Sequence, residues 1–220
     1  MKFKKVTYHV QIADMLRDMI MTGKLEEGDK VHENELCETM GISKTPLREA
    51  LRVLSVEGLI QLVPNRGAFV TKPTFEEISE MFDVMSLLEG FCARKACEKM
   101  TPKDFARLEK LHAKLEQNFE RRDQEEYIRI NNQYHSFVQE IAGNRTLNQI
   151  VDGLRKKILL YRFQSLNLPA RFESSIREHR DLLEAFRQHD HSRAESLMQA
   201  HLQNQSQALG TLVARSRTAS

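Results

Sequence analysis

The most constraining feature of this sequence is an interrupted helical pattern near its beginning. Apolar residues recur at helical spacing over residues 33–40 and again over residues 44–56, and Gly41 separates the two segments. Ser43 stands where a helix N-cap is expected, and Pro46 lies in the first helical turn, where a missing N–H costs least. Two helices joined by so short a turn indicate a helix-turn-helix unit.

The flanking segments extend this unit to a winged form. Residues 7–22 predict a preceding helix, and residues 24–30 are expected to be a polar loop. After the second helix, apolar runs over residues 59–63 and 68–71 flank the turn sequence PNRG at residues 64–67. Two short strands around a tight turn predict a β-hairpin, which is the wing.

The second helix and the hairpin carry a local basic patch in a nearly neutral chain. The chain has 33 Lys and Arg against 31 Asp and Glu, so its overall field neither gathers nor repels polyanions. Residues 44–72, however, hold five basic side chains against two acidic ones. A helix fits the major groove, so its exposed start is expected to meet DNA first. The side chains expected to contact DNA are Lys44, Thr45, Arg48, Arg52 and Arg66, with a basic arm of Lys2, Lys4 and Lys5.

Beyond Pro73 almost the whole chain predicts helices. They are expected over residues 75–100, 102–121, 123–142, 145–165, 170–188 and 191–214. The fold class is therefore mainly α, with a winged helix-turn-helix domain over residues 1–72 and an all-α six-helix bundle over residues 73–220.

Composition excludes several other classes of protein. Three cysteines without regular spacing argue against a disulfide-stapled secreted domain. No run approaches the ~18 apolar residues of a membrane span, and the basic start lacks the apolar core of a signal peptide. We therefore expect a cytoplasmic protein without a membrane partner.

Histidines in the predicted bundle suggest a metal site. Asn131 and His135 are four residues apart and share a helix face, while His179 and His201 lie on two further predicted helices. Three histidines with one oxygen ligand suit a borderline divalent metal such as Zn²⁺ or Ni²⁺. Spacing alone leaves another reading open, because helical histidines are more often satisfied core or surface groups than ligands.

The N-terminal region resembles a known family. The segment GISKTPLREALRVLSVEGLIQLVPNRGAFV is similar to the winged-helix signature of the GntR family of bacterial transcriptional regulators, and the similarity covers residues 8–71. The positions that this resemblance assigns to DNA or its vicinity are Glu33, Thr45, Arg48, Arg66 and Gly67. Lys44 stands where the family usually has Arg, which predicts weaker or different base readout there.

The helical half resembles the FCD effector-binding domain of the FadR branch of that family. In such domains an Asp/Asn-x3-His motif and two later histidines bind a metal. The matching residues are Asn131, His135, His179 and His201. Neutral Asn131 replaces the commoner Asp and is expected to weaken metal affinity. Three other histidines, His112, His189 and His191, match no ligand position and are expected at the solvated surface.

The predicted effector site departs from that of many relatives. Many carry an Arg four residues before a Leu-Glu pair, where it can clamp an effector carboxylate. Here Met85 stands at that spacing before Leu88-Glu89, with Ser86 beside it, so carboxylate binding is expected to depend more on the metal. Residues of a later helix expected to line the pocket are Tyr161, Arg162 and Gln164.

The leading interpretation is a homodimeric, metabolite-responsive transcription factor that represses its genes. One short basic helix offers too few contacts for high specificity, and a palindromic double-stranded DNA operator matches two-fold protein symmetry. A small organic acid bound at the metal would shift the bundle between states and so change DNA affinity.

Two alternatives stay open. A metal-dependent hydrolase-like enzyme with a vestigial DNA-binding module would activate water at the histidines. Asn131 cannot take a proton, however, and Glu178 points about 100° away from His179 on its helix, so we expect no enzyme. A constitutive DNA binder with a purely dimerising helical domain would need no metal.

Overall fold

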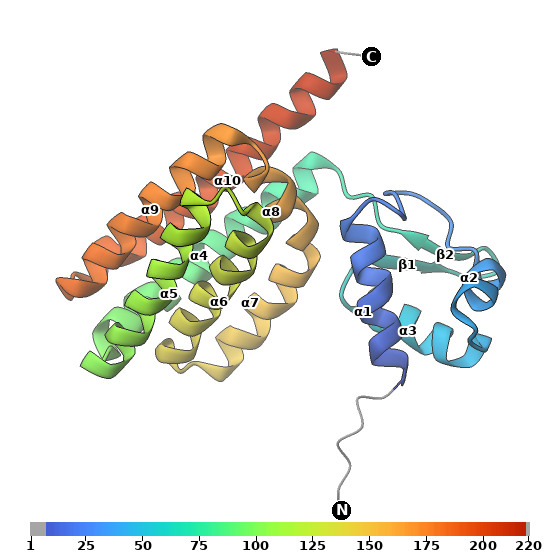
Figure 1. The fold of residues 1–220 in the computed structure, drawn as a ribbon, viewed down its shortest axis with the longest axis horizontal. Helices are drawn as coiled ribbons and strands as arrows, with labels where there is room; N and C mark the ends of the chain where they lie inside the picture. The colour runs from blue at the N-terminus through green and yellow to red at the C-terminus, as the bar shows by residue number, and fades with distance from the viewer. Residues whose placement is uncertain (1–7, 219–220) are drawn as a thin grey trace, which may run out of the picture. The chain divides into compact units, whose positions relative to one another are not determined.

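The chain divides into two compact units, Met1–Pro73 and Thr74–Ser220, in a computed structural model that describes residues 8–218 (Figure 1). The boundary predicted between residues 72 and 73 lies one residue before this division. Residues of the predicted basic arm that lie outside the described part are Lys2, Lys4 and Lys5. Buried apolar side chains are present in both units, as expected of separate domains.

Each element predicted for the N-terminal unit is present, with ends within one residue of those expected. The elements are α1 (Tyr8–Met21), α2 (Glu33–Met40), α3 (Lys44–Val56), β1 (Ile60–Val63) and β2 (Gly67–Val70). Gly41 adopts a left-handed conformation with φ 64°, which ends α2 and begins the tight turn. Ser43 occupies the N-cap position of α3 in an extended conformation, as predicted.

The helices of this unit pack through their apolar faces. α3 buries Leu47 and Leu54 completely, and α1, which packs against it, buries Leu16. Each such side chain contributes about 1.5–3 kcal/mol relative to its exposed state. Arg17 of α1 also pairs with Glu57 after α3, with Nε 3.1 Å from Oε2 and Nη2 3.0 Å from Oε1. The polar face of α3 is left exposed.

The wing is an antiparallel hairpin with a third strand-like segment beside it. Ile60 of β1 lies opposite Val70 of β2. The segment expected to be a loop over residues 24–30 pairs with β2 at its end, because the Val70 N–H donates to the Asp29 carbonyl at 2.8 Å. Asp29 and Val31 flank an isolated bridge between Lys30 and Phe69. A polar segment that pairs only through its backbone has no alternating apolar pattern, so the sequence did not predict this pairing.

In the described part of the C-terminal unit, all regular secondary structure is helical. The helices are α4 (Phe75–Lys99), α5 (Pro102–Glu120), α6 (Gln124–Ala142), α7 (Arg145–Lys157), α8 (Leu159–Leu166), α9 (Pro169–Arg187) and α10 (His191–Thr218). The prediction of one helix over residues 145–165 is wrong, because Ile158 interrupts it with φ −99° and ψ 8°. The described bundle therefore has seven helices rather than six. Ile158 is fully buried in an apolar cluster, so tertiary packing rather than Gly or Pro accounts for the break.

The centre of the bundle is the pairing of α4 with α10. α4 also packs on α6, and α5 packs on α6 and α9. Gly90 allows α4 to approach α10 closely, since a Cβ at Gly90 would lie 2.5 Å from Cγ of Gln199. Tyr127 of α6 and Phe172 of α9 meet edge to face in the main core, with ring centroids 4.9 Å apart. These contacts fix α6, α9 and α10 around a common interior.

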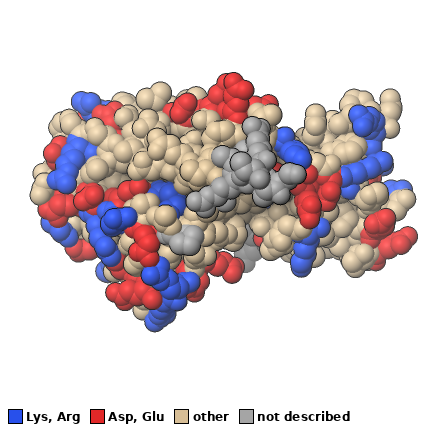
Figure 2. Space-filling view, turned by 90° about the horizontal axis from the view of Figure 1, so that it is seen from above, with Lys and Arg blue, Asp and Glu red and all other residues tan. Residues whose placement is uncertain are grey.

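The surface carries mixed charge. Figure 2 shows Lys and Arg interspersed with Asp and Glu over the face seen from above, without a continuous field of one sign. None of the described helices is long and apolar enough to cross a membrane. The nucleic-acid binding predicted from the sequence would therefore depend on particular side chains rather than on a global field.

Candidate metal centre and nucleic-acid interface

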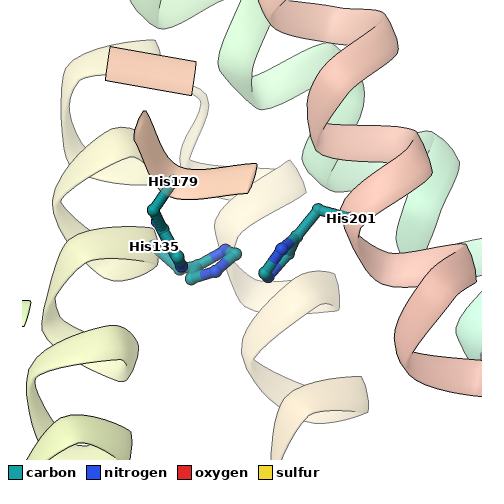
Figure 3. Close-up of side chains that lie close together, drawn as sticks. All are labelled: His135, His179 and His201. Carbon is teal, nitrogen blue, oxygen red and sulfur yellow. The ribbon is translucent and has the colours of Figure 1, made fainter. Parts of the chain in front are cut away.

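Three histidines from three helices meet inside the bundle. His135 of α6, His179 of α9 and His201 of α10 are each 1% exposed or less. Each offers one possible ligand atom, and these atoms lie within 4.8 Å of one another. Figure 3 shows the three side chains entering the same space. The structure thus brings together the three histidines that the sequence singled out.

Carboxylates orient two of the rings. Nδ1 of His135 lies 2.6 Å from Oε2 of Glu89 on α4, and Nδ1 of His201 lies 2.6 Å from Oε2 of Glu178 on α9. An ionised carboxylate accepts the Nδ1–H, which leaves the lone pair on Nε2. Neither Nε2 atom has a hydrogen-bond partner within the described chain, and both are buried. Each is therefore free to coordinate a metal.

Asn131 approaches the third ring. Its Oδ1 lies 2.6 Å from Nε2 of His179, and the Asn131 side chain is 1% exposed. The other nitrogen of His179, Nδ1, is buried without a partner among the described residues. Asn131 can thus act as a neighbouring ligand or as the acceptor that orients His179. Both arrangements place Asn131 beside the three-histidine cluster.

The electrostatics keep these histidines neutral. Burial, with Arg155 and Arg162 adding to it and Glu89 opposing it, lowers the pKa of His135 to about 3. Burial also lowers the pKa values of His179 and His201. Since a metal binds the neutral imidazole, all three are ready as ligands at pH 7 without losing a proton.

Glu89 remains ionised in spite of its burial. Burial alone would raise its pKa, but Arg155, His135 and Arg162 together hold the pKa well below its usual range. Oε1 of Glu89 lies 3.6 Å from Nε of Arg155 on α7. Glu89 thus links the histidine cluster to a buried guanidinium.

Sequence reasoning missed the carboxylate partners. Helix geometry excludes Glu178 as a general base, because it points away from His179 along α9. That same direction brings it to His201 on α10, and Nη2 of Arg171 lies 2.7 Å from its Oε2. Glu89 was noted only as part of a Leu-Glu pair. A partner on a neighbouring helix has no fixed sequence spacing, so only the helix packing identifies it.

The three bundle histidines that match no ligand position divide into two groups. His189 and His191 are exposed, as predicted. The prediction that His112 lies at the solvated surface is wrong, because it is 7% exposed. It lies on α5 at helical spacing from Leu108 and Leu115, both fully buried, and so shares their inward face.

The predicted effector residues are all buried except Gln164, which is exposed. Met85 and Tyr161 belong to one apolar cluster, and Ser86 donates to the Asp83 carbonyl at 2.8 Å. Arg162 differs, because Nε and Nη2 of this buried side chain have no partner in the part of the chain described. Of the predicted effector residues, Arg162 is therefore the one whose buried hydrogen-bond donors are available to a polar ligand.

The predicted DNA contacts gather on one side of the N-terminal unit. One hollow is lined by Lys44 and Arg48 of α3, Glu33 of α2, and Arg66 and Gly67 of the wing. Nε of Arg48 lies 2.8 Å from Oε2 of Glu33, which orients the guanidinium across the hollow. Arg52 lines the adjoining hollow with Arg48. Thr45 is exposed on α3 but lines neither hollow.

Comparison with known families covers both units. The family described as bacterial regulatory proteins, gntR family, matches residues 9–70, and the FCD domain matches residues 80–204. The second match alone covers more than half of the chain. The protein belongs to the GntR family, in the group with an FCD domain. Its winged helix-turn-helix is thus the DNA-binding domain of a GntR regulator, and its helical bundle is an FCD domain.

Curated relatives of this GntR regulator have the same organisation over most of their length. The transcriptional regulator McbR of Escherichia coli K12 is 28% identical over 193 residues, which cover 86% of each chain. The transcriptional repressor RspR of the same strain is 25% identical and covers 90% of this chain and 87% of its own. YdhC of Bacillus subtilis strain 168, a further HTH-type regulator, is 25% identical over 199 residues.

Solved structures share the fold. E. coli McbR/YncC aligns with a TM-score of 0.79 at 23% identity, covering 95% of this chain and all of its own. A GntR-type protein from Rhodococcus sp. RHA1 aligns with a TM-score of 0.75 at 20% identity, covering 93% of this chain and 99% of its own. Because the relatives are transcriptional regulators, the chain is one too and not an enzyme. The hydrolase alternative is therefore dropped.

Proposed function

We propose that this GntR regulator is a homodimeric repressor whose affinity for a palindromic operator is set by a divalent metal and a small organic acid in the FCD domain. The observation that carries this proposal is the trio of buried histidines, each with one nitrogen that has no partner in the described chain. One possible ligand nitrogen from each of three imidazoles, all within 4.8 Å of one another, suits Zn²⁺ or Ni²⁺.

The metal would be held by His135, His179 and His201, with Asn131 beside them. Glu89 and Glu178 would act as outer partners that fix the two rings they contact. When bound, the metal supplies a positive Lewis-acid charge that attracts a carboxylate. Three imidazoles and a neutral amide bring no negative charge of their own, so an anionic effector completes the charge balance.

DNA would be read by α3 and the wing. Arg48 offers a planar fork for guanine, and Lys44 offers a point charge for guanine or phosphate. Thr45 and Arg52 flank them on α3, while Arg66 beside Gly67 suits a minor-groove or phosphate contact. Two copies are needed, because one short helix makes too few contacts for a specific operator.

Repression is supported by likeness to RspR, which is named a transcriptional repressor. Effector binding would shift the bundle between states that hold two DNA-binding domains at different separations. A coupling of about 1–3 kcal/mol is enough to change operator occupancy several-fold or more.

The test uses the full-length protein, purified without chelators. We expect one divalent metal per protomer by elemental analysis, a dimer by light scattering and a shifted band with DNA from its own promoter region. His135→Ala and His179→Ala should lose the metal, whereas the exposed His191→Ala should keep it. Unaltered DNA binding in metal-free variants would instead favour a constitutive binder, and no shift under any condition would contradict the DNA-binding role.

A further inference from the structure

Three arginines are buried close to the histidine cluster. Arg155 of α7, Arg162 of α8 and Arg171 of α9 are 8%, 2% and 3% exposed. A buried guanidinium needs a negative partner and several hydrogen-bond acceptors, because it is always charged and carries five N–H donors. A buried arginine is therefore expected only where a negative charge and hydrogen-bond acceptors compensate its guanidinium group.

The carboxylates in the same interior compensate only part of this charge. Glu89 faces Arg155, and Glu178 contacts Arg171. Three buried guanidinium groups thus face two carboxylates among the described side chains. Arg162 is the guanidinium left over, and although burial lowers its pKa to about 9, it stays protonated at neutral pH.

Unmade hydrogen bonds lie on the same side chains. Nη1 and Nη2 of Arg155, and Nε and Nη2 of Arg162, are buried without a partner in the part of the chain described. Arg171 has one such atom, Nε, and otherwise bonds to Ser174 and His201. The free donors thus concentrate on α7 and α8, and they call for an acceptor with several oxygens.

A metal cannot satisfy these arginines and makes the imbalance larger. A divalent ion adds two positive charges beside the surplus guanidinium, and Asn131 removes the negative charge that an Asp would bring. A monocarboxylate would compensate only one charge. Net positive charge in a buried site is costly, so the complete site calls for an anion with at least two negative groups.

We infer that the effector is an organic dicarboxylate, with one carboxylate at the metal and the other clamped by Arg155 and Arg162. This inference rests on the proposed metal-dependent function. Glu89 connects the two ends of the site, since one oxygen contacts His135 and the other lies 3.6 Å from Arg155.

The test compares ligands that differ by one carboxylate. Full-length protein loaded with Ni²⁺ is titrated calorimetrically with malonate, succinate and glutarate, and with propionate, butyrate and valerate as monocarboxylates of matching length. At least one dicarboxylate is expected to bind ten times more tightly than its monocarboxylate partner. Equal affinity, or no binding by any of the six, would overturn the inference.

Variants locate the clamp. Arg162→Met and Arg155→Met should abolish the preference for the dicarboxylate, while Arg180→Met, which removes an exposed guanidinium paired with Glu116, should keep it. Retention of the full preference in both Met variants would also overturn the inference. If a Met variant does not fold, Arg162→Lys keeps the charge without the planar fork and should weaken the preference.

Two further readings separate this inference from the proposed function. Metal content and DNA band shift are recorded on the same samples. A protein that holds metal and binds DNA but does not prefer dicarboxylates overturns only the effector class. A protein that binds neither metal nor DNA overturns the proposed function itself.

Discussion

At the scale of single residues, the candidate metal centre depends on which nitrogen of each ring is free. Glu89 and Glu178 hold Nδ1 of His135 and His201, so Nε2 faces the centre in both. Asn131 is the residue that tunes the charge of this set, because an amide is neutral where a carboxylate would not be.

Asn131→Asp is expected to tighten metal binding by about tenfold, because the new charge lies beside the ring of His179 and attracts the cation. The measurement is competition against a chelating dye. Asn132→Asp is the matched control, since it adds the same charge one residue along α6 and about 100° around the helix. Equal tightening in both variants would contradict a place for Asn131 at the metal.

Stability of the metal-free protein is expected to fall as pH decreases below about 6.5. Burial lowers the pKa values of His112, His135, His179 and His201 in the folded state, so the unfolded chain binds more protons below its ordinary histidine pKa. Stability is therefore complete above pH 6.5 and is lost as pH falls toward the lowered values. Each group adds up to about 1.4 kcal/mol per pH unit.

Thermal unfolding at pH 7.5, 6.5 and 5.5 measures this dependence of stability on pH. His112→Asn should flatten it, whereas His189→Asn should not, because His189 is exposed and its positive φ of 51° suits Asn. A melting temperature independent of pH over this range would show that the buried histidines are already charged in the folded state.

At the scale of elements, α3 and the wing form the proposed DNA-reading surface, and we expect their side chains to have separable roles. Arg48→Ala should cost about 1–3 kcal/mol of operator binding and relax base preference at one position. Lys44→Ala should reduce specificity less. If Lys44 contacts phosphate, its loss should also reduce the slope of log affinity against log salt concentration by about one. Fluorescence anisotropy over a salt series separates the two effects, and identical behaviour of both variants would contradict this assignment.

The packing of α4 against α10 depends on Gly90. Gly90→Ala should destabilise the protein by about 1–3 kcal/mol, because the added Cβ meets Gln199 at 2.5 Å. Gly153→Ala on α7 has open space around its Cβ and should stabilise by about 0.5–1 kcal/mol. Chemical denaturation of the two variants decides, and equal effects would show that α4 and α10 are not closely packed.

Sequence patterns captured these elements unevenly. The Gly41 stop, the Ser43 cap and the PNRG turn are local signals, so the winged unit was predicted within one residue. The break at Ile158 carries no Gly or Pro, and only its burial in the core explains it. Asn131 and His135 stand out in the sequence because they share a helix face, and the resemblance to FCD domains adds His179 and His201 to them. The carboxylate partners of these histidines could not be predicted, since each hydrogen bond joins two different helices.

At the scale of the whole molecule, function is divided between two units that are each nearly neutral. The reader unit, residues 1–72, carries 11 basic and 10 acidic side chains, and the rest carries 22 and 21. DNA affinity must then come from a few placed side chains, and in the proposed dimer it depends on how the two copies are held. We propose that ligand binding at the buried histidine and arginine cluster of the helical unit determines how the two copies are arranged.

The proposed function requires that metal binding in the helical unit and DNA binding at the winged unit be coupled. The direct test measures operator affinity by anisotropy with and without Ni²⁺, and Ni²⁺ affinity with and without operator DNA, in the wild type and in His179→Ala. We predict that the two wild-type ratios agree with each other and lie between about 5 and 150, as linkage requires, and that the variant shows no change. Operator affinity that is the same with and without metal in the wild type would contradict the account.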